Sequence, residues 1–271
     1  MPKSGRRLLC VLAHPDDESL GTGGTLARYA AEGVETFVVT ATRGERGRFG
    51  DVEPRPAPEV VGQAREAELR AAARVLGVKE VSFLDYLDAE LDQAPPQEVT
   101  DKIASHIRRI RPQVVITFGH DGGYGHPDHI AISQFALAAI VRAAVGESRP
   151  DSRPHAVSKF YHMAWDETNW SAYQSAFKSL SSKVDGVERR PAPWPDWSIT
   201  SVVDASAHWE TVWRAVQCHK TQISVYAKLG DLTPNQHQAL WGRQTYYRVF
   251  STVNGGRARE TDLFEGLRES E

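Results

Sequence analysis

The chain has 271 residues, of which 41% are hydrophobic and 25% are charged, and its formal net charge at pH 7 is −3. This composition predicts a soluble globular protein with a full core. With 32 basic and 35 acidic residues, the chain has no broad cationic field that would hold phosphate backbones, which argues against nucleic acid as its main partner.

The first half alternates apolar, β-rich runs with helical patterns. Strands are predicted at 8–13, 34–42, 80–86 and 113–119, and helices at 25–33, 59–78, 96–112 and 129–146. Such alternation with near-continuous apolar strands predicts an α/β fold, a Rossmann-like three-layer sandwich in which helices cover both faces of a mostly parallel sheet.

The pattern loosens beyond residue 146. A polar, proline-containing loop precedes a predicted strand at 159–165, residues 189–198 resist regular structure, and a helix is predicted at 208–230. All seven tryptophans lie at or beyond Trp165 and form either a wall around a ligand or, as we favour, a packing layer. The tail from Asn254 is expected to fray. We expect one domain over 1–271, with a motif-bearing half (1–146) and a substrate-loop half (147–271).

Cysteine usage and hydropathy indicate the compartment. Cys10 and Cys218 are the only cysteines, so there is no disulfide framework, as in reducing compartments. The basic start of the chain precedes an apolar run that ends at acids after about six residues, too early for a secretory signal. No stretch approaches the roughly 18 apolar residues that span a bilayer. We expect a cytoplasmic protein without stable membrane insertion, while a homo-oligomer stays open.

Two clusters of ionisable residues follow predicted strands. His-Pro-Asp-Asp-Glu (14–18) follows the first strand, and Gly-His-Asp-Gly-Gly-Tyr-Gly-His-Pro-Asp-His (119–129) follows the fourth. Ligands of such sheets bind at the carboxyl ends of the strands, and right-handed crossovers bring distant strand ends together. We therefore expect one site built from both clusters.

The residue types in these clusters suit a divalent metal. His14 and Asp17 are three residues apart, as are His126 and His129, so a turn can aim each pair at one point. His14, Asp17 and His129 form a three-ligand set for Zn²⁺, or for Fe²⁺ or another divalent ion, with a position left open for water.

Simpler interpretations compete with the metal site. A histidine near a strand end is usually a satisfied polar residue, and an Asp–Asp pair often caps a helix. Gly-Thr-Gly-Gly (21–24) suggests a nucleotide loop, but the acidic cluster occupies the turn where that motif belongs. The shared spacing and placement of the two clusters favour the metal.

The remaining polar residues suit hydrolysis. Asp16 adjoins a ligand without being needed as one, so it can accept the proton of an attacking water. His126 can donate a hydrogen bond to the oxyanion that forms, with Asp128 orienting its ring.

Together these motifs resemble the PIG-L/LmbE-like family of metal-dependent N-deacetylases, closely over 7–145 and weakly beyond. The resemblance rests on residues 14–18 and on Gly23, Gly24, Thr25, Arg65, Glu68 and residues 122–129. It implies the same metal ligands and the same base, and it implies that His126 stabilises the tetrahedral intermediate and protonates the leaving amine. Tyr124 matches a mobile tyrosine that helps polarise the carbonyl.

The resemblance also suggests substrate contacts. Arg65 and Asp85 match positions that contact sugar hydroxyls in sugar deacetylases of the family, although they could equally form a structural ion pair. His219 lies in a segment similar to a family His-x-Ser-Gln motif, with threonine replacing serine. Apart from the resemblance, Glu45 follows the second strand and is predicted near the same rim, where a solvated loop is the alternative.

The predicted function is therefore hydrolysis of an N-acyl group, such as acetyl, from a small N-acylated amino sugar. One alternative is an amidase that acts on a thiol-sugar conjugate. Another is a noncatalytic Rossmann-like protein that binds a metal or a nucleotide. The sequence leaves the aglycone of the substrate and the identity of the metal open.

Overall fold

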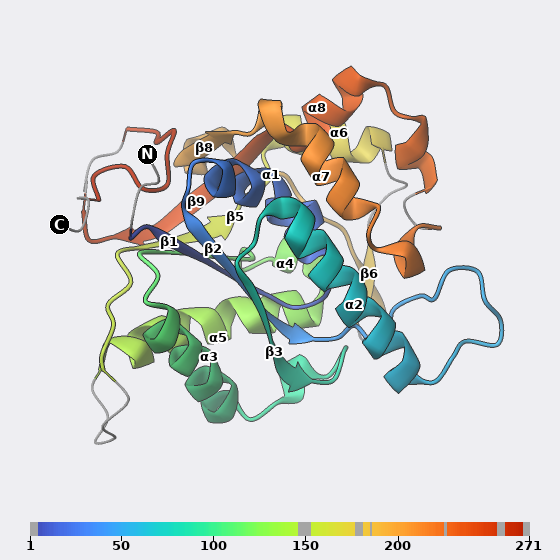
Figure 1. Cartoon of the computed structure of the whole chain (residues 1–271), viewed down its shortest axis with the longest axis horizontal. Helices are drawn as coiled ribbons and strands as arrows, with labels where there is room; N and C mark the ends of the chain where they lie inside the picture. Colours follow the sequence, from blue (N-terminus) through green and yellow to red (C-terminus); the bar gives the residue numbers. More distant parts are fainter. Residues whose placement is uncertain are drawn as a thin grey trace.

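The computed structural model describes residues 5–145, 153–176, 181–184, 186–224, 227–253 and 258–267. Its centre is a seven-stranded sheet in the order β3-β2-β1-β4-β5-β9-β8 (Figure 1). The first five strands in chain order are mutually parallel: β1 (Arg7–Leu12), β2 (Glu35–Thr42), β3 (Glu80–Tyr86), β4 (Val114–Thr117) and β5 (Lys159–Met163). Beyond β5, β9 (Arg243–Ser251) pairs antiparallel with β5, and β8 (Ser201–Asp204) pairs antiparallel with β9 and forms the edge of the sheet.

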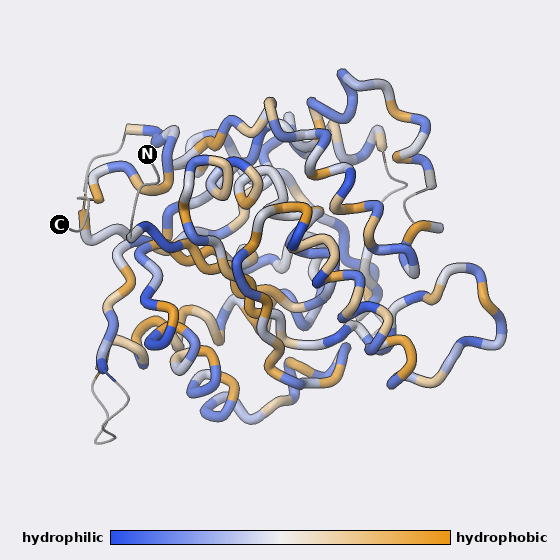
Figure 2. The backbone as a smooth tube through the Cα atoms, in the orientation of Figure 1, coloured by the Kyte–Doolittle hydropathy of each residue, from blue (hydrophilic) through white to orange (hydrophobic). Residues whose placement is uncertain are grey.

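Helices cover both faces of the sheet, which confirms the predicted three-layer fold (Figure 1). One face carries α3 (Pro96–Ile110) and α5 (Pro127–Ala144), which pack on each other. The other face carries α1 (Asp17–Ala31), α2 (Pro58–Leu76) and α7 (Trp209–Val216), with α8 (Pro234–Trp241) beside α7. Because both faces are covered, β1 is buried from Leu8 to Leu12, and Figure 2 shows hydrophobic residues along the central strands.

The helix predicted at 25–33 begins earlier, at Asp17. Acidic Asp17 and Glu18 occupy its first turn, where the helix dipole favours negative charge. The glycines at 21–24 therefore lie inside α1 and form no nucleotide loop. A Cβ on Gly24 would lie 2.7 Å from the Cβ of Ala205, so this glycine permits close packing against the chain before α7.

The prediction of a single helix over 208–230 is wrong. α7 ends at Val216, and two 3₁₀ turns follow, η4 (Lys220–Gln222) and η5 (Ala227–Asp231). Polar groups around His219 and Thr221 bond to acidic side chains of α1 and α2 instead of continuing a helix. Tertiary partners thus override the helical pattern.

The irregular region is described in large part. Residues 189–198 contain only the end of a short hairpin, β6 (Ser182–Val184) with β7 (Val187–Arg189), and a 3₁₀ turn, η2 (Asp196–Ser198). Residues 146–152 of the predicted loop and residues 254–257 and 268–271 of the tail lie outside the described residues. None of the described helices is both long and apolar enough to cross a lipid bilayer.

The tryptophans serve both predicted roles. Trp209, Trp213 and Trp241 belong to a second hydrophobic cluster between α6 (Glu167–Ala176), α7 and α8. Trp170 is a buried member of this cluster and Trp165 packs against it, and both also line a cavity together with Trp194. Trp197 is 84% exposed. The C-terminal half therefore supplies both a packing layer and a wall for the site.

Candidate metal centre and active site

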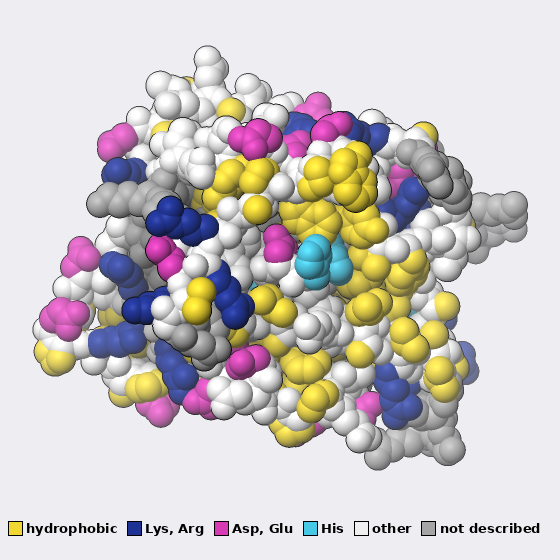
Figure 3. Space-filling model, turned by 180° about the vertical axis from the view of Figure 1, so that it is seen from behind, with side chains coloured by type: hydrophobic (Ala, Val, Ile, Leu, Met, Phe, Trp, Pro, Cys, Tyr) yellow, Lys and Arg dark blue, Asp and Glu magenta, His cyan; other side chains and the backbone are white. Residues whose placement is uncertain are grey.

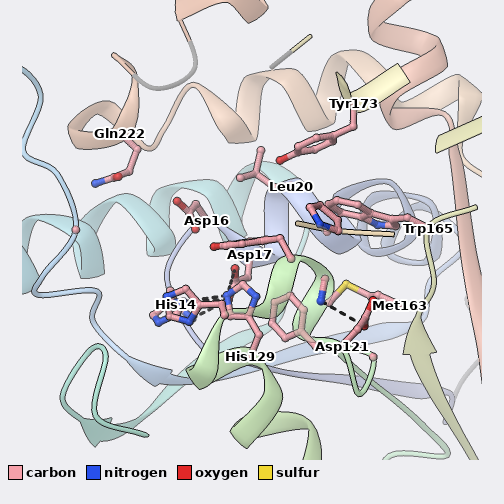
Figure 4. A pocket seen from close by; sticks show the side chains of 18 of the residues that line it. His14, Asp16, Asp17, Leu20, Asp121, His129, Met163, Trp165, Tyr173 and Gln222 are labelled. Atoms are coloured by element: carbon pink, nitrogen blue, oxygen red, sulfur yellow. Dashed lines mark hydrogen bonds and ion pairs between the residues drawn. The ribbon is translucent and has the colours of Figure 1, made fainter. Parts of the chain in front are cut away.

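The two clusters meet in one cavity of about 410 Å³ at the carboxyl ends of the parallel strands. His14 and Asp16 come from the β1–α1 turn, and Asp17 is the first residue of α1. His126 directly precedes α5, and His129 lies in its first turn. Figure 4 shows that His14, Asp17 and His129 point toward one another across more than a hundred residues of chain. The predicted convergence of the two segments is confirmed.

Three buried side chains place possible ligand atoms around one point. His14 Nδ1 lies 3.2 Å from His129 Nε2, and the Asp17 carboxylate lies 3.8 Å from the former and 3.5 Å from the latter. The other Asp17 contacts come from the backbone N–H groups of Ala13 and His14, which donate to Oδ2 at 3.2 and 2.8 Å. Oδ1 is thereby directed at His129.

Outer partners decide which histidine nitrogens carry protons. His129 Nδ1 must donate to the carbonyl oxygen of Gly122 at 3.1 Å, since that oxygen only accepts. His14 Nε2 lies 3.1 Å from carboxylate oxygens of both Asp88 and Asp128 and must likewise donate. The two remaining nitrogens face each other with their lone pairs, an arrangement that requires a cation or a proton between them. Two imidazoles and a carboxylate thus fit a divalent metal.

Among the described residues, two groups of side chains have ligand atoms that all lie within 4.8 Å of one another, and neither group contains Asp17. One replaces Asp17 by His126, and the other joins His14 to Asp88 and Asp128. In the second group, the His14 nitrogen that faces the acids is the protonated Nε2. These acids therefore orient His14 from the outside.

The charges of the centre are strongly coupled. Burial lowers the pKa of His14, but hydrogen bonds with Asp128 and Asp88 outweigh it and raise that pKa to about 10. Burial lowers the pKa of His129 well below its ordinary value, with a further contribution from the charge of His14. Burial raises the pKa of Asp17 to about 7. The centre as a whole is a buried anionic site that a cation would stabilise.

Asp16 has an unusual backbone. Its φ of 100° lies in the left-handed region, which costs a residue with a side chain of order 1–3 kcal/mol. The Asp16 N–H donates to Glu18 at 3.0 Å, and the side chain lies 3.2 Å from the guanidinium of Arg65. Arg65 is buried and also donates to the carbonyl oxygens of Pro15 and Gly44. These contacts hold the Asp16 carboxylate at the cavity beside the metal centre.

His126 and Tyr124 complete the polar end of the cavity. The backbone N–H of Asp128 donates to His126 Nδ1 at 3.2 Å, which leaves Nε2 as the protonated nitrogen. The ring of His126 stacks on His129 at 4.7 Å. Tyr124 lies on the short turn α4 (Gly122–Gly125), with its ring 5.3 Å from that of His129, and burial raises the pKa of its hydroxyl.

The sequence suggested that the Asp128 carboxylate orients the His126 ring, but the structure does not show this contact. That carboxylate is fully buried, contacts His14 and accepts hydrogen bonds from the N–H groups of Ala89 and Leu91. Only its backbone N–H reaches His126. Because Asp128 follows His126 by two residues at the start of α5, its backbone N–H and not its side chain lies next to the His126 ring.

Among the predicted substrate-binding residues, Arg65 alone lines the cavity. Asp85 pairs with Arg43 at 2.6 Å, and its side chain is 66% exposed. Glu45 lies one layer behind the cavity, where it accepts from the N–H of Asp88 at 3.3 Å. His219 is fully buried, 2.8 Å from Glu18, so it supports the first turn of α1 instead of facing the cavity.

Asp88 was missed in the sequence. It lines the cavity from a turn after β3, between two residues with left-handed backbone, Asp85 and Ala89. No motif marks it, but its position beyond the carboxyl end of a parallel strand was an available signal. Gln222, which follows His219, also reaches the cavity and donates to the carbonyl oxygen of Arg48 at 2.7 Å.

Comparison with known proteins places this site in a family. The model of the PIG-L family, described as GlcNAc-PI de-N-acetylase, matches residues 9–140. The chain is 37% identical to a 1D-myo-inositol 2-acetamido-2-deoxy-alpha-D-glucopyranoside deacetylase of Streptomyces griseus, over 97% of this chain and 89% of the relative.

Two solved structures share the fold at 20% identity. N,N'-diacetylchitobiose deacetylase from Pyrococcus horikoshii matches with a TM-score of 0.66 over 91% of this chain and 85% of its own. The 4-carboxy-2-hydroxymuconate hydratase GalB of Pseudomonas putida matches with a TM-score of 0.70 over 93% of this chain and 99% of its own. These two likenesses show the architecture alone, whereas the extent and identity of the match to the Streptomyces protein show that the chain belongs to the PIG-L family.

Proposed function

We propose that this protein is a zinc-dependent N-deacetylase that hydrolyses the acetamide of a small N-acetylated amino sugar. The observation that carries the proposal is the convergence of two histidine lone pairs and one carboxylate beside Asp16. The fold alone would not decide the reaction, since a hydratase shares it. The similarity to a curated sugar deacetylase supports the choice of an amide bond.

His14, Asp17 and His129 would hold the metal. Two imidazoles and one carboxylate suit zinc, with an open position, and ferrous iron accepts the same set. When bound, a divalent ion there would act as a Lewis acid that lowers the pKa of water to about 7 and polarises the acyl oxygen.

Asp16 is the proposed general base. Its carboxylate takes one proton from water as the water oxygen bonds to the acyl carbon. The C–N bond then breaks, and the same proton passes from Asp16 to the departing nitrogen, so that the products are a free amine and acetic acid, which ionises to acetate. We assign this transfer to Asp16 and not to His126, to which the resemblance gave it, because burial lowers the pKa of His126 to about 4 and a neutral ring would become an imidazolate on losing its proton. Arg65, 3.2 Å from Asp16, keeps the carboxylate in place between these two transfers.

His126 and Tyr124 are the proposed donors to the oxyanion. Because Nδ1 of His126 accepts from the backbone, Nε2–H is the group left to donate to the negative charge that develops on the acyl oxygen. The Tyr124 hydroxyl keeps its proton, since burial raises its pKa, and is a second donor on the same side of the centre.

Sugar hydroxyls would be bound by the polar residues at this end of the cavity. We assign this role to Arg65 and Asp88, both of which line it. The buried carboxylate of Asp88 accepts from the N–H of Arg46 at 3.1 Å and is fixed in position.

The test is release of free amine from N-acetylglucosamine and its glycosides by the zinc-loaded protein, with acetate measured in parallel. We expect equal amounts of both products, and we expect Asp17→Ala to abolish them. The matched control is Asp85→Asn, at an exposed carboxylate outside the cavity, which should keep wild-type turnover. A zinc-loaded, folded protein that releases neither product would contradict the proposal and favour a binding protein.

A further inference from the structure

The cavity has two chemically different ends. Ionisable residues surround the metal centre, whereas the opposite side is an aromatic wall, defined as Leu20, Met163, Trp165, Trp170, Tyr173 and Trp194. Figure 4 shows Trp165, Met163 and Tyr173 set apart from His14 and His129 across the cavity. Figure 3 shows a histidine near the centre of the opposite face, with hydrophobic side chains above it and to its right.

Apart from Leu20 of α1, the aromatic wall is built from residues that lie outside the segment matched by the family model. Trp165 follows β5, Trp170 and Tyr173 lie on α6, and Trp194 lies in the irregular segment before η2. Its identity therefore does not follow from the catalytic motifs. The parts that perform the proposed chemistry and the part that would meet the rest of the substrate come from different halves of the chain.

Contacts within the wall hold its rings in place. The rings of Trp165 and Tyr173 lie 4.8 Å apart, and those of Trp165 and Trp170 lie 6.1 Å apart in a stacked arrangement. The backbone N–H of Trp194 donates to the carbonyl oxygen of Trp165 at 2.8 Å. The indole N–H of Trp194 donates to Asp121 at 3.2 Å, so the polar atom of this side chain already has a partner.

The side chains of the aromatic wall favour one kind of substrate group over another. Trp165 and Trp194 are only partly buried and line the cavity, although Trp165 also packs against the second hydrophobic cluster. A polyol placed against these faces could bury C–H groups on the rings, but its hydroxyl groups would lose hydrogen bonds to water and find few protein groups in return. A flat apolar group would bury the exposed ring faces and stack on them.

We propose that the substrate carries a flat apolar or aromatic aglycone, which stacks on the aromatic wall while the acetamide lies at the metal centre. This inference rests on the proposed function and adds the chemical class of the substituent beyond the sugar. It distinguishes the chain from a deacetylase whose aglycone is an inositol.

The experiment compares methyl, inositol and phenyl glycosides of N-acetylglucosamine with the zinc-loaded protein. We expect kcat/KM for the phenyl glycoside to exceed that for the methyl glycoside by about tenfold or more, since a stacked aromatic contact and its buried area together reach that factor. Trp165→Ala and Trp194→Ala should reduce this ratio toward one. Trp197→Ala, at a tryptophan that is 84% exposed and outside the cavity, should leave the ratio unchanged.

Binding provides a readout that needs no turnover. The Asp16→Asn variant should bind the phenyl glycoside about tenfold or more tightly than the methyl glycoside. Equal values of kcat/KM and of Kd for the two glycosides would overturn the aromatic subsite while leaving the deacetylase proposal intact. Turnover that responds to a longer N-acyl chain but not to the aglycone would also overturn it. Selective binding without turnover would contradict the proposed function instead.

Discussion

Replacing Asp128 by Asn removes a charge that the structure uses three times. The carboxylate lies 3.1 Å from His14 Nε2 and accepts from the N–H groups of Ala89 and Leu91 at 2.7 and 3.2 Å. An amide has one oxygen, so its NH₂ must face at least one of these donors. If it faces Leu91, a buried N–H is left without an acceptor, at about 1–3 kcal/mol of stability.

The metal centre would weaken as well. Without the negative charge of Asp128, His14 is held in its tautomer by Asp88 alone, and its free nitrogen becomes a poorer ligand. Loss of such an outer partner typically lowers metal affinity about 10- to 100-fold, which corresponds to about 1.4–2.8 kcal/mol. We therefore expect Asp128→Asn to bind zinc about 10- to 100-fold more weakly than wild type.

Competition with a chelator of known affinity measures this change, and thermal unfolding reports the stability of the same samples. Asp85→Asn is the matched control, because that side chain is 66% exposed and, in the part of the chain that the structure describes, its ion-pair partner is Arg43 on the outside of the cavity. Wild-type zinc affinity in Asp128→Asn would refute the assigned link between Asp128 and His14.

Three further predictions concern the base and two buried pairs. Asp16→Asn should keep the metal but lower kcat by about 10²- to 10⁴-fold, and wild-type kcat would contradict its role as base. His219→Ala removes the ion-pair partner of the buried Glu18, so thermal unfolding should show a loss of about 3 kcal/mol. Because Glu18 accepts from the Asp16 N–H, kcat should fall too, and wild-type kcat would contradict a role of Glu18 in positioning Asp16. Burial raises the pKa of Glu260, but the hydrogen bond from Lys159 and others outweigh it and hold this pKa below 4.5. The pair's stability is thus complete above pH 4.5 and is lost as the pH falls, so denaturant unfolding of Glu260→Gln should depend less on acid than that of wild type.

The parallel half of the fold was predictable because each strand is a continuous apolar run between helical patterns. Leu8 to Leu12 illustrate this, since burial on both faces leaves no polar position in the strand. The start of α1 was missed because its first residues are also site residues, and their charges obscured the helical pattern. The break after α7 was missed because the partners of His219 and Thr221 lie far away in sequence.

The candidate metal ligands were predictable for a similar reason. His14, Asp17 and His129 sit at fixed offsets just beyond strands, where topology alone brings them together. Asp85 and Asp88 show the limit of this reasoning. They are three residues apart, with Asp85 near the end of β3 and Asp88 just beyond it, yet Asp88 lines the cavity and Asp85 does not. The partners of Asp128 were equally invisible, because they depend on the path of the chain after β3.

The most direct test of the central claim is a titration of chelator-treated protein with zinc, in which bound metal and deacetylation of N-acetylglucosamine glycosides are followed together. The proposed site predicts one ion per chain, activity that rises in step with occupancy to a maximum at one equivalent, and loss of both in His129→Ala. Full activity in the metal-free protein, or zinc binding that is unchanged in His129→Ala, would contradict it.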